Sequence, residues 1–200
     1  MRLMTSLLMI AVLTACIGRS SYSPTAGLAR LCNDARIYGA QVGEVDGNGA
    51  CGIGRAVTIS EIAGVQLNPS ATLNCRSART LADWIENDAK RALRGTGGRL
   101  ESMRVFASYA CRSRNSQPGA RMSEHALGNA IDIGEFVLNN GTVLNVERDW
   151  GNGNAGAALE RLHASACGPF GTVLGPLSDR FHYNHIHFDT ADNRSSSYCR

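Results

Sequence analysis

The stretch Phe-His-Tyr-Asn-His-Ile-His-Phe-Asp, residues 181–189, holds three of the chain's five histidines. Side chains on a strand alternate between its two faces. If the stretch is a strand, His185 and His187 point to one side while Ile186 and Phe188 face the core. The pattern therefore predicts a buried strand that presents an H-x-H pair on the face away from the core.

A second segment, Ser-Glu-His-Ala-Leu-Gly-Asn-Ala-Ile-Asp at residues 123–132, contributes His125 and Asp132. We expect these two side chains to come from a loop and from the start of a strand that neighbours the His187 strand. Imidazole nitrogen and carboxylate oxygen suit Zn²⁺, and three protein ligands with an open fourth position are typical of a catalytic site. An exposed H-x-H pair or a turn-capping Asp is common by itself, so the zinc prediction depends on both segments together.

Other titratable residues lie close to these in the sequence. His182 is open to three interpretations: a partner of a metal ligand, a substrate contact or a surface residue. His163 falls on the polar side of an expected helix and is predicted to be solvated. Glu124, Glu135 and Asp189 are alternative carboxylate bases, or groups that orient the ligands.

The first 15 residues have the organisation of an export signal: Arg2, an apolar run over 3–13 and small residues before Cys16. The run is too short to span a bilayer as a helix. Leu-Thr-Ala-Cys at 13–16 is similar to a bacterial lipobox, although an ordinary signal peptide ending near a cysteine is the alternative. We expect a signal peptide over 1–15, a lipidated Cys16 with a tether over 16–28, and an exported protein anchored at the periplasmic face of the envelope, at the outer membrane.

The chain has seven cysteines, and lipidation of Cys16 leaves an even number in an oxidising compartment. No two of them are spaced as a C-x-x-C knuckle, so disulfides are favoured over thiolate zinc ligation. Three disulfides are predicted, with the pairing left open, among Cys32, Cys51, Cys75, Cys111, Cys167 and Cys199.

The composition is that of one loop-rich globular domain, predicted over residues 29–200 and as a monomer. Hydrophobic residues make up 44% of 200, and 22 are glycine. The net charge of +3 comes from scattered residues and forms no basic stripe, which argues against nucleic-acid binding.

Hydrophobic periodicity predicts an α+β fold: a small, mostly antiparallel sheet carrying the zinc site, flanked by helices and stapled by disulfides. Period-2 alternation predicts further strands at 56–59, 103–109, 130–138, 143–146 and 172–174. Helical spacing predicts helices at 28–38, from Asn68-Pro69 to Gly95, and at 156–167.

The motif S-x-H-x-x-G-x-A-x-D at 123–132, followed by H-x-H at 185–187, resembles the zinc peptidase superfamily of the D-Ala-D-Ala carboxypeptidases and penicillin-insensitive murein endopeptidases. From about residue 32 to 189 the chain resembles the bacterial extensin-like C-terminal domain family more closely. The additional motifs that carry this resemblance are Cys51-Gly52-Ile53, Ala71-Thr72-Leu73-Asn74-Cys75, Ser108-Tyr109-Ala110-Cys111-Arg112 and Val173-Leu174-Gly175-Pro176.

The superfamily resemblance implies a zinc ion held by His125, Asp132 and His187. The carboxypeptidase branch has a Glu base three residues before the last ligand, but Asn184 stands there and cannot take a proton. His185 matches the endopeptidase branch, in which the first histidine of H-x-H is the base. Arg112 resembles the arginine that faces the scissile carbonyl.

Residues and resemblance together predict an exported zinc metallopeptidase that hydrolyses peptide bonds in peptidoglycan, as a D,D-endopeptidase or a carboxypeptidase-like enzyme. Its partners would be peptidoglycan peptides and, through the lipid, a membrane. Asn184 suggests the alternative, a non-catalytic cell-wall-binding lipoprotein that retains the metal pocket. Metal uptake or storage is less favoured, because three ligands including a carboxylate suit catalysis better.

Overall fold

The computed structural model of the 200-residue chain describes residues 28–192 and 196–200. The predicted signal peptide, Cys16 and all of the tether except its last residue lie outside these ranges. Within them, no helix combines the length and the apolar character needed to cross a membrane.

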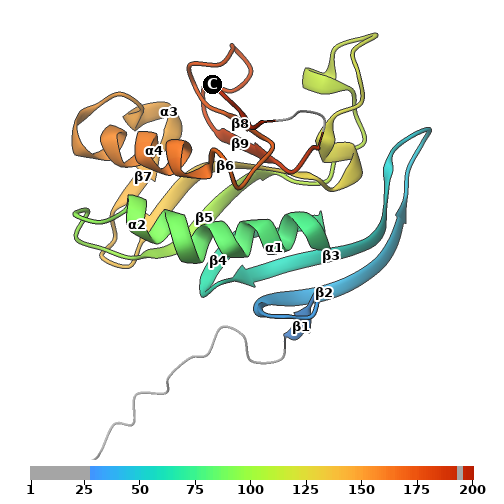
Figure 1. The fold of residues 1–200 in the computed structure, drawn as a ribbon, viewed down its shortest axis with the longest axis horizontal. Coiled ribbons are helices and arrows are strands. Elements are labelled where there is room, and N and C mark those ends of the chain that lie inside the picture. Colours follow the sequence, from blue (N-terminus) through green and yellow to red (C-terminus); the bar gives the residue numbers. More distant parts are fainter. Residues whose placement is uncertain (1–27, 193–195) are drawn as a thin grey trace, which may run out of the picture.

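Ten strands of the described chain form one sheet, ordered β1-β2-β3-β4-β5-β6-β9-β8-β10, with β7 paired to β6 (Figure 1). The strands are β1 (Ala29–Leu31), β2 (Asp34–Asp46), β3 (Gly52–Ile62), β4 (Val65–Asn74), β5 (Leu100–Ala107), β6 (Ala130–Leu138), β7 (Val143–Asn145), β8 (Thr172–Leu174), β9 (Ile186–Asp189) and β10 (Tyr198–Cys199). Only β4–β5 and β8–β10 pair in parallel. The predicted mostly antiparallel sheet is confirmed, and the strand predicted at 56–59 lies within β3. The prediction that the sheet is small is wrong, because β1, β2, β4 and the extra length of β3 extend it well beyond the strands expected.

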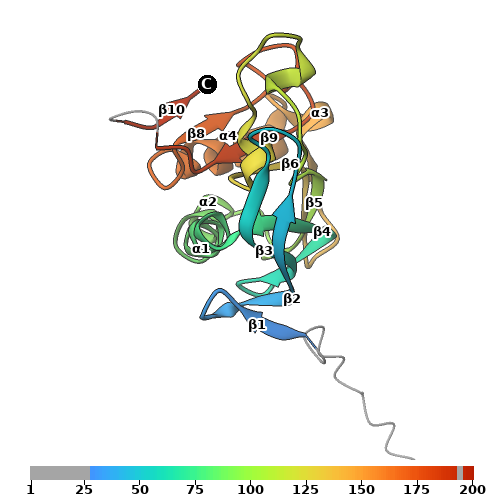
Figure 2. The ribbon, with the colours of Figure 1, turned by 90° about the vertical axis from the view of Figure 1, so that its right-hand side faces the viewer.

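Two helical elements cover one face of this sheet. The first is a continuous rod of α1 (Cys75–Trp84), a π-helical segment η1 (Ile85–Ala89) and α2 (Lys90–Ala92). The second is α4 (Gly153–Ala166), which follows the short α3 (Val146–Asp149). The rod and α4 lie side by side, and Figure 2 shows the rod on one side of β3 and β4 with no helix opposite it.

The core lies between these helices and the sheet. Trp84 is fully buried and its ring centroid lies 5.1 Å from that of Phe188 and 6.1 Å from that of Phe170. Its indole N–H donates to the Ser165 hydroxyl at 3.0 Å, which satisfies the polar atom of this large apolar side chain. Because Phe188 points into the core, its neighbour His187 points to the opposite face of the sheet, as predicted.

The helix predicted over 28–38 is wrong, because the chain forms β1, a tight turn and the start of β2. Cys32 and Asn33 have φ values of 57° and 53°, and Leu31 pairs with Asp34 across the turn. Left-handed residues in a two-residue turn suit the twist of a hairpin, and Asn tolerates this conformation better than most residues.

The start of the long helix at Asn68-Pro69 is also wrong, since these residues lie within β4. The buried residues of this strand alternate in position: Val65, Leu67, Ala71 and Leu73. The helix begins at Cys75, where the Asn74 side chain accepts a hydrogen bond from the Ser77 N–H at 2.9 Å. An Asn does cap this helix, but the capping residue is Asn74 and not Asn68.

The six cysteines of the described residues form three disulfides, which confirms their predicted number. The pairs are Cys32–Cys75, Cys51–Cys111 and Cys167–Cys199. None of these sulfurs is left free beside the histidines.

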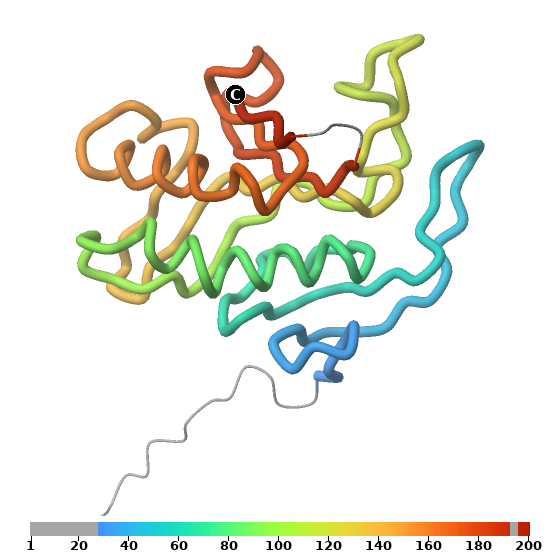
Figure 3. The backbone as a smooth tube through the Cα atoms, in the orientation of Figure 1, coloured from blue at the N-terminus to red at the C-terminus, as the bar shows by residue number. Residues whose placement is uncertain are grey.

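Two segments project beside the sheet, as the backbone trace shows (Figure 3). One is the tip of the long β2–β3 hairpin, and the other is residues 112–122, which we call the 112–122 arm. The Cys51–Cys111 disulfide joins the hairpin to the residue that precedes the arm. The arm includes a short 3-10 turn, η2 (Arg114–Ser116), and leads into another, η3 (Glu124–Leu127).

Candidate metal centre

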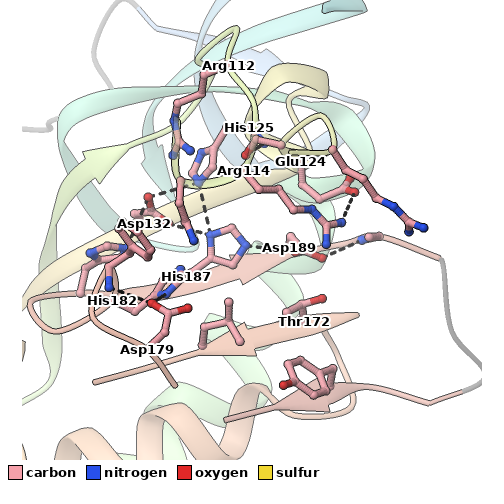
Figure 4. A pocket seen from close by; sticks show the side chains of 18 of the residues that line it. Arg112, Arg114, Glu124, His125, Asp132, Thr172, Asp179, His182, His187 and Asp189 are labelled. Atoms are coloured by element: carbon pink, nitrogen blue, oxygen red, sulfur yellow. Dashed lines mark hydrogen bonds and ion pairs between the residues drawn. The ribbon is translucent and has the colours of Figure 1, made fainter. Parts of the chain in front are cut away.

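His125, Asp132 and His187 come together on the face of the sheet opposite the helices. Asp132 on β6 pairs directly with His187 on β9, so the two strands are neighbours as expected. His125 reaches them from η3, and all three residues are buried. Figure 4 shows the three side chains pointing toward one another at the base of a pocket.

The donor atoms of this trio are close enough to share one ion. Nε2 of His125 lies 3.2 Å from Nδ1 of His187 and 3.2 Å from Oδ2 of Asp132. Nδ1 of His187 lies 2.8 Å from Oδ1 of Asp132. A tetrahedral zinc with bonds of about 2.0–2.1 Å separates its ligand atoms by roughly 3.3 Å, so the donor set fits this metal.

Each histidine of the trio is oriented through its other ring nitrogen. The Nδ1–H of His125 donates to the Ser108 carbonyl at 2.6 Å, which leaves Nε2 as the coordinating atom. The Nε2–H of His187 donates to Asp189 at 3.0 Å, which leaves Nδ1 toward the trio. Such outer hydrogen bonds fix the tautomer and ring orientation of metal-binding histidines. Of its predicted roles, Asp189 therefore has the geometry of an orienting group.

The local structure explains Ser123 and Gly128 in the motif around His125. The Ser123 hydroxyl accepts from the His125 N–H and caps the turn η3. Gly128 ends the turn with a φ of 65°, and a Cβ there would lie 2.4 Å from the Ile53 side chain. Glycine is therefore required both by conformation and by the close approach of β3.

Burial and hydrogen bonding act in opposite directions on the acidic and basic groups of the trio. Burial favours the neutral form of Asp132, but the hydrogen bonds and the charge attraction of His125 and His187 together outweigh it and hold the pKa of Asp132 well below its usual range. Burial also opposes the charge on His187, yet Asp132 and Asp189 raise its pKa to about 9. The centre is thus a strongly coupled polar cluster inside the protein.

His185 lies at the edge of the trio, just before β9. The expected strand over 181–189 is shorter than predicted, because residues before Ile186 form turns, but His185 and His187 still line the same pocket. Nε2 of His185 is 3.6 Å from Oδ2 of Asp132, and its Nδ1–H donates to the Asn184 side-chain oxygen at 2.9 Å. Burial lowers the pKa of His185 to about 4, so the ring is neutral at pH 7 with Nε2 free.

His182 is also part of this site, and the structure excludes one of its three interpretations. It is buried, its Nδ1–H donates to Asp179 at 2.7 Å, and its ring packs against those of His185 and His187. Burial raises the pKa of Asp179, but the hydrogen bonds from His182 and from the Phe181 N–H, together with the attraction of His182, outweigh it and the net shift is downward. His182 is therefore not a surface residue.

The trio opens on a pocket of about 620 Å³, the size of small-molecule and peptide sites. The arginines that line the pocket are Arg112, Arg114 and Arg121, all from the 112–122 arm. Arg112 lies above His125 in Figure 4. Arg114 and Arg121 carried no signal in the sequence, because arginines on an irregular loop follow no period.

Three further residues that the sequence singles out form hydrogen bonds outside the trio. Glu124 lines the pocket but accepts from the Asn129 amide at 2.8 Å, and Glu135 pairs with Asn145 outside the pocket lining. His163 was predicted to be solvated, and this is wrong. It is half-buried, with Nε2 donating to the Arg200 carbonyl at 3.0 Å and its ring against Trp150.

Comparison with known proteins gives one match. The family model described as "Extensin-like protein C-terminus" matches residues 28–200, a range that includes every residue the structure describes. Neither a curated protein nor a solved structure matches the chain significantly.

Proposed function

The chain belongs to the extensin-like protein C-terminus family, and for this member we propose a zinc metallopeptidase that hydrolyses peptide bonds in peptidoglycan after export. The single observation that supports the proposal most is the buried trio with His185 beside it. Two imidazoles and a carboxylate converge from three separate segments, and each imidazole is oriented from behind. This is the donor set of a catalytic zinc with an open position.

His125, Asp132 and His187 would hold the metal. Bound there, zinc would supply a water of lowered pKa and a Lewis acid for the substrate carbonyl. Because the trio lies at the base of the pocket, a peptide bond that reaches it passes the side chains that line the pocket, which include those of the arm.

His185 is the proposed general base. Its Nε2 is unprotonated at neutral pH and lies 3.6 Å from Oδ2 of Asp132, and both residues line the pocket. It can therefore accept a proton from the attacking water and return it to the leaving amine. The hydrogen bond to Asn184 holds the ring in the tautomer that this role needs.

Arg112 is the proposed stabiliser of the charge that develops on the carbonyl oxygen. It lines the same pocket, and among the described residues its one recorded side-chain hydrogen bond is a weak contact of 3.4 Å to the Ser113 carbonyl. A guanidinium held near the reacting carbonyl and free of a carboxylate partner can stabilise an oxyanion.

The second candidate is a cell-wall-binding lipoprotein that keeps the pocket without turnover. Asn184 favours it, since this position carries a Glu base in the carboxypeptidases that the motifs resemble. The first candidate requires His185 to perform that role, which the second does not.

Purified mature protein incubated with crosslinked and uncrosslinked muropeptides separates the two candidates. The peptidase proposal predicts cleavage products that disappear with a chelator and return when zinc is restored. No product from any of these substrates, with tight binding to intact sacculi that His185→Ala leaves unchanged, would instead establish the binding protein.

A further inference from the structure

The 112–122 arm is a hydrogen-bonded hairpin and not a loose loop. Ser113 and Met122 form an antiparallel bridge, and the Arg114 N–H donates to the Arg121 carbonyl at 2.8 Å. Arg114 and Arg121 therefore face each other across the arm, and both line the pocket. The arm returns to the sheet at Ser123, two residues before His125.

These two arginines are weakly engaged within the described chain. Arg114 has one recorded ion pair, with Glu124 at 3.8 Å, and the Glu124 carboxylate already accepts from Asn129. Within residues 28–192 and 196–200, the Arg121 side chain makes no hydrogen bond or ion pair. By contrast, Arg36 meets three carboxylates at 2.6 to 2.8 Å.

The aspartates that line the pocket already have hydrogen-bond or ligand roles. Asp179 accepts from His182, and Asp189 accepts from His187. Asp132 belongs to the metal ligands. The unmatched charge in the pocket is therefore positive and lies on the arm, several residues of chain away from the trio.

We propose that Arg114 and Arg121 form a clamp for a free carboxylate of the substrate, and that this clamp selects peptides with an acidic group near the bond to be cleaved. The inference rests on the proposed function and adds a specificity element to it. Two guanidinium groups can bind a carboxylate through paired charge-assisted hydrogen bonds. A neutral amide at the same place has one acceptor oxygen in place of two and no negative charge. It would leave some guanidinium N–H groups without an acceptor, so it should bind more weakly.

The carboxylate could be the C-terminal one or that of an acidic side chain. A synthetic stem pentapeptide that contains D-Glu and ends in D-Ala-D-Ala distinguishes the two sources, together with its C-terminal amide and its side-chain amide. Binding is measured by calorimetry with zinc-loaded His185→Ala protein, in which turnover should be strongly reduced. Arg114→Gln, Arg121→Gln and the double substitution are added to this background.

The clamp predicts that the double substitution weakens binding of the free peptide by about tenfold or more. One of the two amidated peptides should bind the protein with both arginines about as weakly as the free peptide binds the double variant. The double substitution should weaken binding of that amidated peptide little further. That peptide identifies the carboxylate that the clamp holds. Arg94→Gln, an exposed arginine beyond α2 and outside this pocket, should leave all three affinities unchanged.

Equal losses for acid and amide, no loss in the double variant, or no binding of any peptide would overturn the clamp. Both arginines are exposed, so an unchanged melting temperature verifies that each variant folds. Carboxylate-dependent binding by a protein that hydrolyses none of these peptides would contradict the peptidase proposal while leaving the clamp intact. Hydrolysis of these peptides with no preference between acid and amide would support the peptidase proposal and contradict the clamp.

Discussion

The strands under the pocket hold their polar side chains in place through contacts of 2.6 to 3.2 Å, whereas the 112–122 arm presents arginines whose closest ion pair is 3.8 Å long. The first region is buried in a continuous sheet, and the second projects from it and is largely exposed. Rigid elements give the precision that metal binding and proton transfer need, while a hairpin can adapt to a ligand. On this basis the proposed metal binding and proton transfer belong to β6, η3, β9 and the residue before β9, while the arm supplies the proposed arginines that contact the substrate.

His185→Ala should have the largest effect on the strand side of this contrast. Removing the proposed base should lower kcat on muropeptides by about 10²–10⁴-fold, while the zinc content stays unchanged because the ligands remain. His163→Gln is the matched control, since His163 lies on α4 outside the pocket. Unchanged kcat in His185→Ala would move the base to another residue.

Loss of the Cys51–Cys111 disulfide should act on the arm side. The double Ser variant should lose about 2–4 kcal/mol of unfolding free energy, because the bridge closes a long loop, with a sequence separation of 60. It should also raise KM more than it lowers kcat, since it frees the residue before the arm.

The matched control is the double Ser variant of Cys32 and Cys75, a bridge between the β1–β2 turn and α1 that lies away from the pocket. It should lower stability without changing KM. Equal effects of the two double variants on KM would mean that the disulfide does not position the arm.

Asp189→Asn tests whether the strand side depends on its outer hydrogen bonds. The variant should weaken zinc binding by about 10–100-fold, because the Nε2–H of His187 loses its carboxylate partner. Asp179→Asn, which disturbs His182 and no proposed ligand, should leave zinc affinity unchanged. Competition with a chromogenic chelator measures both variants.

His163 gives the smallest expected effect, and one on stability alone. Burial lowers the pKa of His163 below its usual value of 6.5, so the folded protein binds a proton there less readily than the unfolded chain. The stability that the neutral His163 contributes to the fold is fully present above about pH 6.5. It is lost as the pH falls from there through the lowered pKa of the folded protein.

At pH 8, His163→Gln should cost about 1 kcal/mol for the hydrogen bond to the Arg200 carbonyl. The difference in stability between variant and native protein should shrink at pH 5, as measured by urea unfolding. A difference that grows on acidification would contradict the direction of the pKa shift.

Much of the strand side could be predicted from the sequence. The alternation of Ile186, His187 and Phe188 is strong because one face of β9 packs on Trp84, and the predicted strands at 130–138 and 172–174 are confirmed beside it. The helix at 156–167 is confirmed as α4 within a few residues. These elements are buried on a defined face, so their residues carry the period.

The missed parts lie where one face of the sheet is polar and open. On β3 and β4, Thr58 and Thr72 hydrogen bond across the strands, as do Ser60 and Ser70, so this face lacks an apolar pattern. β2 has few buried residues, so its start shows little alternation and the sequence predicts a helix over 28–38 there. Sheets extended by such strands exceed what hydrophobic period alone predicts.

The zinc content of the purified protein, measured by mass spectrometry beside His125→Ala, tests the central claim most directly. His125 is buried, so circular dichroism must first show that the variant keeps its fold. The account predicts about one zinc per chain in the native protein and close to none in the variant. A folded native protein without zinc, or a variant that keeps it, would contradict the assignment of this centre.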